Sequence, residues 1–176
     1  MDPTTGIPWK HHLLWGLGLG AAVSLCIQIL TWVGLGLSHV TWILFYVLVA
    51  VFAYLAARSY RDLLGARPGF LRAVLLIAVM ILVSRLIYQS YMWVYINFVD
   101  PGWVDMVAEF WSAQLAEAGV AEEKIAENIA IFRRQWETDY VFTLGILSFG
   151  VAQFVVGVVV AVVGVVQPWR RRASSS

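Results

Sequence analysis

Charged residues are scarce in this sequence of 176 amino acids. Only 13% of the residues are Asp, Glu, Lys or Arg, about half of the roughly 25% that soluble globular domains carry. The charges are also segregated, and four predominantly apolar stretches reach or approach the about 20 residues that a helix needs to cross a bilayer. Because 61% of the residues are hydrophobic, one soluble core could not bury them. We therefore predict an all-α integral membrane protein.

Cysteine and the common catalytic motifs are also nearly absent. The single cysteine, Cys26, cannot form an intrachain disulfide, and no HExxH, GxSxG or CxxC motif occurs. The histidines cannot converge on a metal ion, because His11 and His12 are expected on one side of the membrane and His39 on the other. No basic face gathers with aromatic residues, which argues against nucleic-acid binding. We expect no catalytic residue, metal, cofactor or nucleic acid, and predict that the chain is not an enzyme.

The apolar runs predict a single membrane domain over residues 1–176 with four transmembrane helices. We expect the spans at about residues 13–37, 40–57, 73–99 and 140–167. Between the first two spans only Ser38-His39 is polar, so these spans must form a tight antiparallel hairpin.

Two of the predicted spans carry small residues at regular spacing. Gly16 and Gly20 lie one helical turn apart, and Gly150, Gly157 and Gly164 follow one another at intervals of seven residues. Such spacing places small residues on one helix face, where they let two backbones approach closely in a membrane. The helix that packs there could belong to the same chain or to a second copy.

The basic residues predict the orientation of the chain. They gather in the stretch Arg58–Arg72 and in Arg170–Arg172, and Lys10 precedes the first span. Because short segments rich in Lys and Arg stay in the cytoplasm, both termini are predicted to be cytoplasmic. Residues 100–139 hold nine acidic and three basic residues, a net of −6, and would face outward. This outward side would be the periplasm if the membrane is a bacterial inner membrane.

Residues 100–139 also show helical periodicity. Apolar residues recur there at spacings of three and four on both sides of Gly119, which predicts two amphipathic helices joined by a turn. We expect this helical hairpin, inserted between the third and fourth spans, to lie on the membrane or to cap the bundle. Its candidate face for a partner or for the membrane surface comprises Trp103, Phe110, Trp111, Phe132 and Trp136.

Arg85 is the one charged residue deep inside a predicted span. It lies 13 residues after Arg72 and 15 before Asp100, about 20 Å from either end at 1.5 Å per residue. A charge at mid-bilayer costs at least about 2.5–3.5 kcal/mol, and such residues usually face a bundle interior or a wet cavity. No Asp or Glu occurs in the four predicted spans, so other groups must hold Arg85. The candidate intramembrane polar site comprises Arg85, Gln89, Gln28 and Gln153.

The end of the third predicted span and the acidic segment together resemble a known family. Tyr95-Ile96-Asn97-Phe98-Val99-Asp100-Pro101 is followed by a helical pattern, by Gly119, and by Glu122-Glu123-Lys124-Ile125, which opens the next helix. With four spans around a long acidic insert, most of the chain resembles the bacterial family called domain of unknown function 4199. The resemblance implies an inner-membrane protein of four helices. It implies no activity and supplies no functional residue.

Two functional hypotheses remain open at this level. The first is a non-catalytic accessory or interaction protein that uses its acidic outer hairpin, with the lipid bilayer around it and a second copy or another membrane protein as partner. The second is a small oligomeric transporter or channel, in which Arg85 attracts an anion. Against the second stands the simpler interpretation that Arg85 joins helices through hydrogen bonds.

Overall fold

The computed structural model describes residues 8–36, 38–65, 68–141 and 150–163. In these ranges every regular element is helical, which agrees with the predicted all-α class. The elements in chain order are α1 (Trp9–Trp32), α2 (His39–Leu64), α3 (Phe70–Val94), the π-helix η1 (Tyr95–Val99), α4 (Trp103–Glu117), α5 (Glu122–Arg134), α6 (Thr138–Val141) and α8 (Gly150–Ala161).

Three of these segments are long and apolar enough to cross a membrane. They are α1, α2, and the continuous segment that α3 forms with η1, which has 30 residues. Helix α8 is apolar but spans only 12 residues. The predicted fourth span at 140–167 lies partly outside the described residues, so the count of four spans, and an insert between the third and the fourth, stay predictions.

Helix α1 packs against α3 through its glycines. A Cβ atom added at Gly16 would lie 2.6 Å from Val83 Cβ, and one added at Gly20 would lie 2.8 Å from Ile87 Cβ. Only residues without a side chain permit so close a crossing. The predicted packing role of Gly16 and Gly20 is therefore confirmed, and the helix that packs on them belongs to the same chain.

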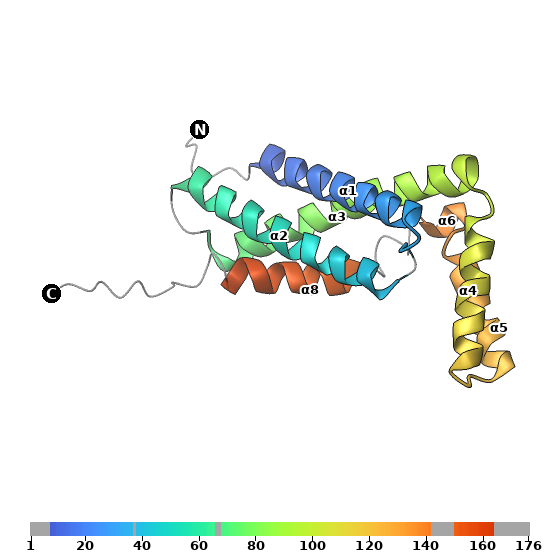
Figure 1. Ribbon diagram of the computed structural model, residues 1–176. Coiled ribbons are helices and arrows are strands. Elements are labelled where there is room, and N and C mark those ends of the chain that lie inside the picture. The colour runs from blue at the N-terminus through green and yellow to red at the C-terminus, as the bar shows by residue number, and fades with distance from the viewer. Residues whose placement is uncertain (1–7, 37, 66–67, 142–149, 164–176) are drawn as a thin grey trace.

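Helix α2 and helix α8 complete the bundle around the other side of α3 (Figure 1). Ala53, Ala56 and Ala57 are fully buried in α2. In α8, a Cβ atom at Gly157 would lie 2.8 Å from Ile77 Cγ2 of α3. The core thus combines small residues on α1, α2 and α8 with larger side chains of α3, among them Leu76, Ile77 and Met80.

The helix ends differ from the predicted span limits for reasons of local chemistry. Helix α1 begins at Trp9 and ends at Trp32, before Gly34 takes a φ of 77°. Helix α2 continues through the basic residues Arg58 and Arg61 until Gly65 caps it at a φ of 62°. Glycine adopts this left-handed conformation at little cost, which is why it ends helices. Much of the predicted basic loop Arg58–Arg72 is therefore helix.

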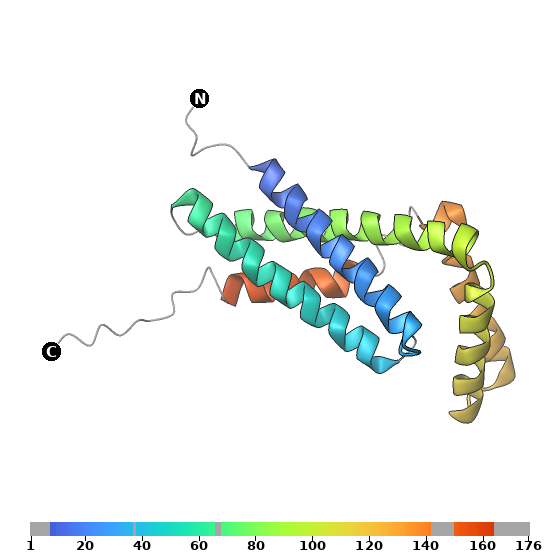
Figure 2. The same ribbon diagram turned by 45° about the horizontal axis from the view of Figure 1, so that its top comes forward.

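Helices α4 and α5 form a separate antiparallel pair beyond the end of α3. They run crosswise to the long helices and extend away from the bundle to one side (Figures 1 and 2). The turn between them ends α4 with Gly119 at a φ of 75°, where Val120 N–H donates to Leu115 O. We call the end of the bundle at which α3 leads into α4 the α4 end. Helix α1 ends there and helix α2 begins there.

Candidate functional site

The seam between α4 and α5 is held by aromatic rings and one ion pair. Trp103 and Trp136 meet edge to face, with ring centroids 5.3 Å apart, and Phe132 contacts Trp136 at 6.4 Å. Arg133 pairs with Asp105 across the two helices. Two of the five residues in the predicted partner face, Trp103 and Trp136, therefore join the two helices, and Phe132 packs on Trp136 within its own segment.

The other two residues of that face remain exposed on α4. Phe110 and Trp111 are 38% and 41% exposed, and their neighbour Met106 is 48% exposed, whereas Val107 and Ala108 of the same helix are buried. We call Met106, Phe110 and Trp111 the α4 patch. The apolar stripe of the sequence thus divides into a part that faces α5 and a part that faces outward.

The structure also divides the predicted intramembrane polar site. Arg85 and Gln89 are buried, at 5% and 3% exposure, and the guanidinium of Arg85 lies 5.6 Å from the centre of the Tyr88 ring. Such a cation–π contact stabilises a cation where water is scarce. Gln28 lies on α1, where its amide oxygen accepts a hydrogen bond from the Tyr91 hydroxyl. Gln153 on α8 is half-buried, and no hydrogen bond joins it to Arg85 among those described.

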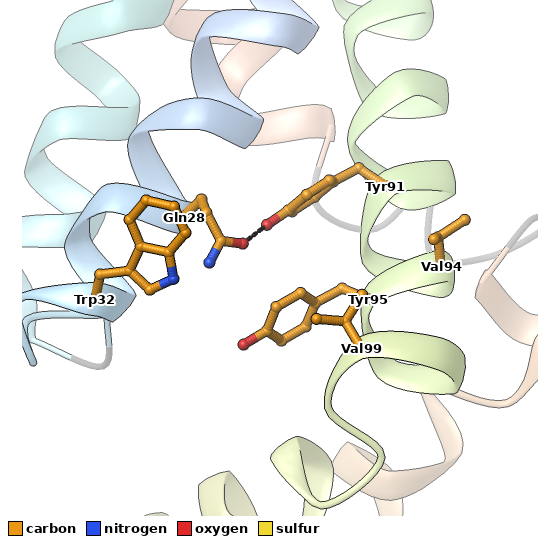
Figure 3. Close-up of a pocket in the computed structure, with 6 residues that line it drawn as sticks. All are labelled: Gln28, Trp32, Tyr91, Val94, Tyr95 and Val99. Atoms are coloured by element: carbon orange, nitrogen blue, oxygen red, sulfur yellow. Dashed lines mark hydrogen bonds between the residues drawn. The ribbon is translucent and has the colours of Figure 1, made fainter.

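A pocket of about 300 Å³ lies between the last turn of α1 and the end of α3. Its lining residues are Gln28, Trp32, Tyr91, Val94, Tyr95 and Val99, and Figure 3 shows the Gln28–Tyr91 hydrogen bond across it. Tyr95 adds a second hydroxyl to the lining, and that hydroxyl donates to Oδ2 of Asp100 at 3.5 Å, a carboxylate that lies next to the pocket without lining it. A mostly apolar hollow with a few convergent polar groups is the usual form of a small-molecule site.

The π-helix η1 shapes one wall of this pocket. In an α-helix four residues exceed one turn of 3.6 residues, so side chains four apart drift around the axis. A π turn holds more residues than an α turn, so side chains four apart rotate in the opposite direction around the axis. Tyr91, Tyr95 and Val99 therefore all face the pocket. Asp100 N–H closes this turn by donating to Tyr95 O at 2.8 Å. Single π turns are frequent at functional sites.

The opposite end of α1 holds a cluster of histidines and aromatic residues. His12 is fully buried, its Nδ1 donates to Pro8 O at 3.0 Å, and its ring meets Tyr60 edge to face at 5.1 Å. His11 Nε2 accepts from Trp15 Nε1, because an indole can only donate. These histidines join α1 to the end of α2. In the described ranges no three His, Cys, Asp or Glu residues come close enough to hold a metal ion.

The comparison with protein families decides the classification. The family described as "Protein of unknown function (DUF4199)" matches residues 14–164, which is 151 of the 176 residues. The chain belongs to the DUF4199 family. Neither the curated proteins nor the solved structures contain a match to it.

Membership of DUF4199 confirms the resemblance drawn from the segment around Asp100 and from Gly119. Together with the long apolar helices, it places the chain among membrane proteins that have an uncharacterised role. No residue role comes with the family, so function has to be inferred from the geometry above.

Sequence reasoning missed the pocket between α1 and α3. Of its lining residues only Gln28 was a candidate. Trp32, Tyr91 and Tyr95 lie near span ends, where aromatic residues commonly anchor a helix at the membrane surface, so their residue types alone do not indicate a pocket. Their spacing could have done so, because Tyr91, Tyr95 and Val99 recur every four residues and Asp100-Pro101 follows at once.

Proposed function

We propose that this chain is a non-catalytic interaction protein of the bacterial inner membrane, which binds a partner protein through the α4 patch on the extracytoplasmic side. The observation that carries the proposal is the exposure of Phe110 and Trp111 on a helix pair whose seam is already filled by other rings. Aromatic residues that are not needed for internal packing are typical anchors of protein interfaces.

The distribution of charge supports the proposed side of the membrane. Arg58 and Arg61 lie in the last turns of α2, and Arg72 lies in the first turn of α3. These positions are at the end of the bundle opposite to α4. The positive-inside rule assigns that end to the cytoplasm, which would put α4 and α5 outside with both termini in the cytoplasm.

Charge also favours a protein partner over a lipid surface. The helix pair carries exposed carboxylates next to the patch, including Glu109 and Glu117, and residues 100–139 have a net charge of −6. Membranes with anionic lipids attract basic segments and repel acidic ones. The expected partner therefore presents an apolar recess rimmed by Lys or Arg.

Site-specific photocrosslinking in intact cells tests this proposal. A benzophenone amino acid at Phe110 or Trp111 is expected to give one discrete protein adduct, while the same probe at Ala130, which is exposed on α5, gives none. The double change Glu109→Lys and Glu117→Lys should abolish the adduct, because it removes the complementary charge. Labelling of lipid alone, or equal adducts at Ala130, would refute the proposal.

The second candidate function is an anion pathway at Arg85. It is favoured by one observation, the burial of a cation and of the neighbouring Gln89 inside the bundle. Anion flux into liposomes should then fall with Arg85→Leu but persist with Arg72→Leu, which changes an exposed arginine at the start of α3. Unchanged flux in an Arg85→Leu protein that still folds would remove this candidate.

A further inference from the structure

The pocket at the α4 end of the bundle has an open side that is surrounded by apolar side chains. Trp32, Val99 and Val94, which line it, are 78%, 66% and 47% exposed. Large apolar side chains exposed on a membrane-spanning helix contact lipid. A molecule that enters this pocket from the side therefore comes from the bilayer.

The size of the pocket limits how much of a lipid it can hold. A volume of about 300 Å³ lies at the lower end of the range for small-molecule sites. It suits a headgroup with its glycerol, or part of one acyl chain, while the rest of the lipid stays in the bilayer. The 24 residues of α1 extend about 36 Å, slightly more than the hydrocarbon layer of about 30 Å. Because the pocket begins one turn before the end of α1, it would lie near the depth at which headgroups and acyl chains meet.

The polar groups select the kind of headgroup. Gln28, Tyr91 and Tyr95 offer an amide and two hydroxyls, and the carboxylate of Asp100 lies against the Tyr95 hydroxyl. No Lys or Arg is among the lining residues in the described ranges. An anionic phosphoglycerol headgroup would meet a carboxylate and no cation. A headgroup that ends in an ammonium would pair with that carboxylate, while its phosphate accepts hydrogen bonds from the amide.

We propose that this pocket binds the headgroup and glycerol of phosphatidylethanolamine, with the amine at Asp100 beside the Tyr95 hydroxyl, the phosphate near Gln28, and both acyl chains in the bilayer outside the pocket. The π-helix contributes by bringing Tyr95 and Val99 to the side of Tyr91. The proposed lipid site needs no contact from the α4 patch, so it can stand or fall independently of the docking role proposed above.

Native mass spectrometry in detergent with equimolar phosphatidylethanolamine and phosphatidylglycerol tests the site. Wild-type protein is expected to retain the ethanolamine lipid at least about fivefold over the glycerol lipid. Val99→Trp should fill the pocket and reduce that retention severalfold. Leu82→Trp is the matched control, because Leu82 lies on the same helix, 56% exposed and outside the pocket, and it should retain lipid as the wild type does.

A second variant tests the role of charge. Asp100→Asn should equalise the retention of the two lipids without lowering the total, because the pocket stays open. Melting temperatures in detergent show whether each variant is folded, and a destabilised Val99→Trp is replaced by Val99→Phe. Equal retention of both lipids by the wild type, a preference for phosphatidylglycerol, or equal effects of Val99→Trp and Leu82→Trp would each overturn the proposal.

Discussion

The contact between α1 and α3 makes a sharp prediction about alanine. In Gly16→Ala the new methyl group would lie 2.6 Å from Val83 Cβ and 3.0 Å from the carbonyl oxygen of Met80. Carbon atoms in favourable contact are about 3.5–4.0 Å apart, so the two helices must separate by roughly 1 Å. Neither atom can rotate away, because one is a Cβ and the other belongs to the backbone.

The expected cost follows from two opposing terms. Overpacking a tight contact typically costs about 1–3 kcal/mol, whereas replacing glycine by alanine in a helix gains about 0.5–1 kcal/mol of backbone entropy. We expect Gly16→Ala and Gly20→Ala each to lower the free energy of unfolding by about 1–2 kcal/mol. The double variant should lose less stability than the two single variants added together. The helix separation that one alanine causes already relieves part of the clash at the other.

The control, Gly18, lies two residues further along the same helix and faces another direction. At Gly18 the added methyl would meet only the Cε1 atom of Phe52, at 3.3 Å, and an aromatic side chain can move by a few tenths of an ångström. Gly18→Ala should therefore be neutral or slightly stabilising. The assay is reversible unfolding in mixed micelles of increasing SDS fraction, followed by circular dichroism. If Gly16→Ala and Gly18→Ala unfold at the same SDS fraction, the close packing of α1 on α3 is refuted.

Three further predictions concern other contacts. Trp136→Ala should speed amide hydrogen exchange throughout α4 and α5 but not in α1. Trp136→Phe should leave the exchange rates unchanged, because the buried indole N–H has no hydrogen-bond partner in the described structure. Equal exchange rates in the two variants would contradict the role of the Trp136 ring at the seam. Arg133→Gln should cost less than about 1 kcal/mol, and the difference should vanish at high salt, because both partners of the ion pair are largely exposed; a cost that persists in 1 M salt would count against it. Ala56→Leu should cost about 1–3 kcal/mol in SDS unfolding by overpacking a residue with no exposed surface, and a neutral result would show that the α2 contact can expand.

The sequence predicts the helical class and much of its internal packing for identifiable physical reasons. Gly16 and Gly20 are informative because in lipid, where all helices are apolar, only small residues allow close approach. Gly119 is informative because few other residues readily adopt the left-handed backbone conformation that ends α4. The order of the charged residues also predicts α5, because Glu residues in its first turn and Arg residues in its last turn suit the helix dipole.

The candidate site is less predictable, since periodicity shows which residues share a face but not what covers it. Phe110 and Phe132 belong to equivalent stripes in the sequence, yet Phe110 is exposed and Phe132 is half-buried beside Trp136. Gln28, which the sequence groups with Arg85 as a candidate polar site, forms a hydrogen bond with Tyr91 that no local pattern indicates. Such pairings depend on the rotation and crossing of whole helices, which local patterns do not encode.

The unusual length of the segment formed by α3 and η1 links the position of the α4–α5 pair to the thickness of the bilayer. Its 30 residues would extend about 45 Å at 1.5 Å per residue, against a hydrocarbon layer of about 30 Å. Tilt within the usual range of 0–40° does not absorb that excess, so one end must stand out of the hydrocarbon. Only Asp100–Gly102 separates η1 from α4. A change in membrane thickness would therefore change the distance of α4 and α5 from the bilayer surface, or their angle to it. The lipid composition would then determine how far the α4 patch lies from the membrane.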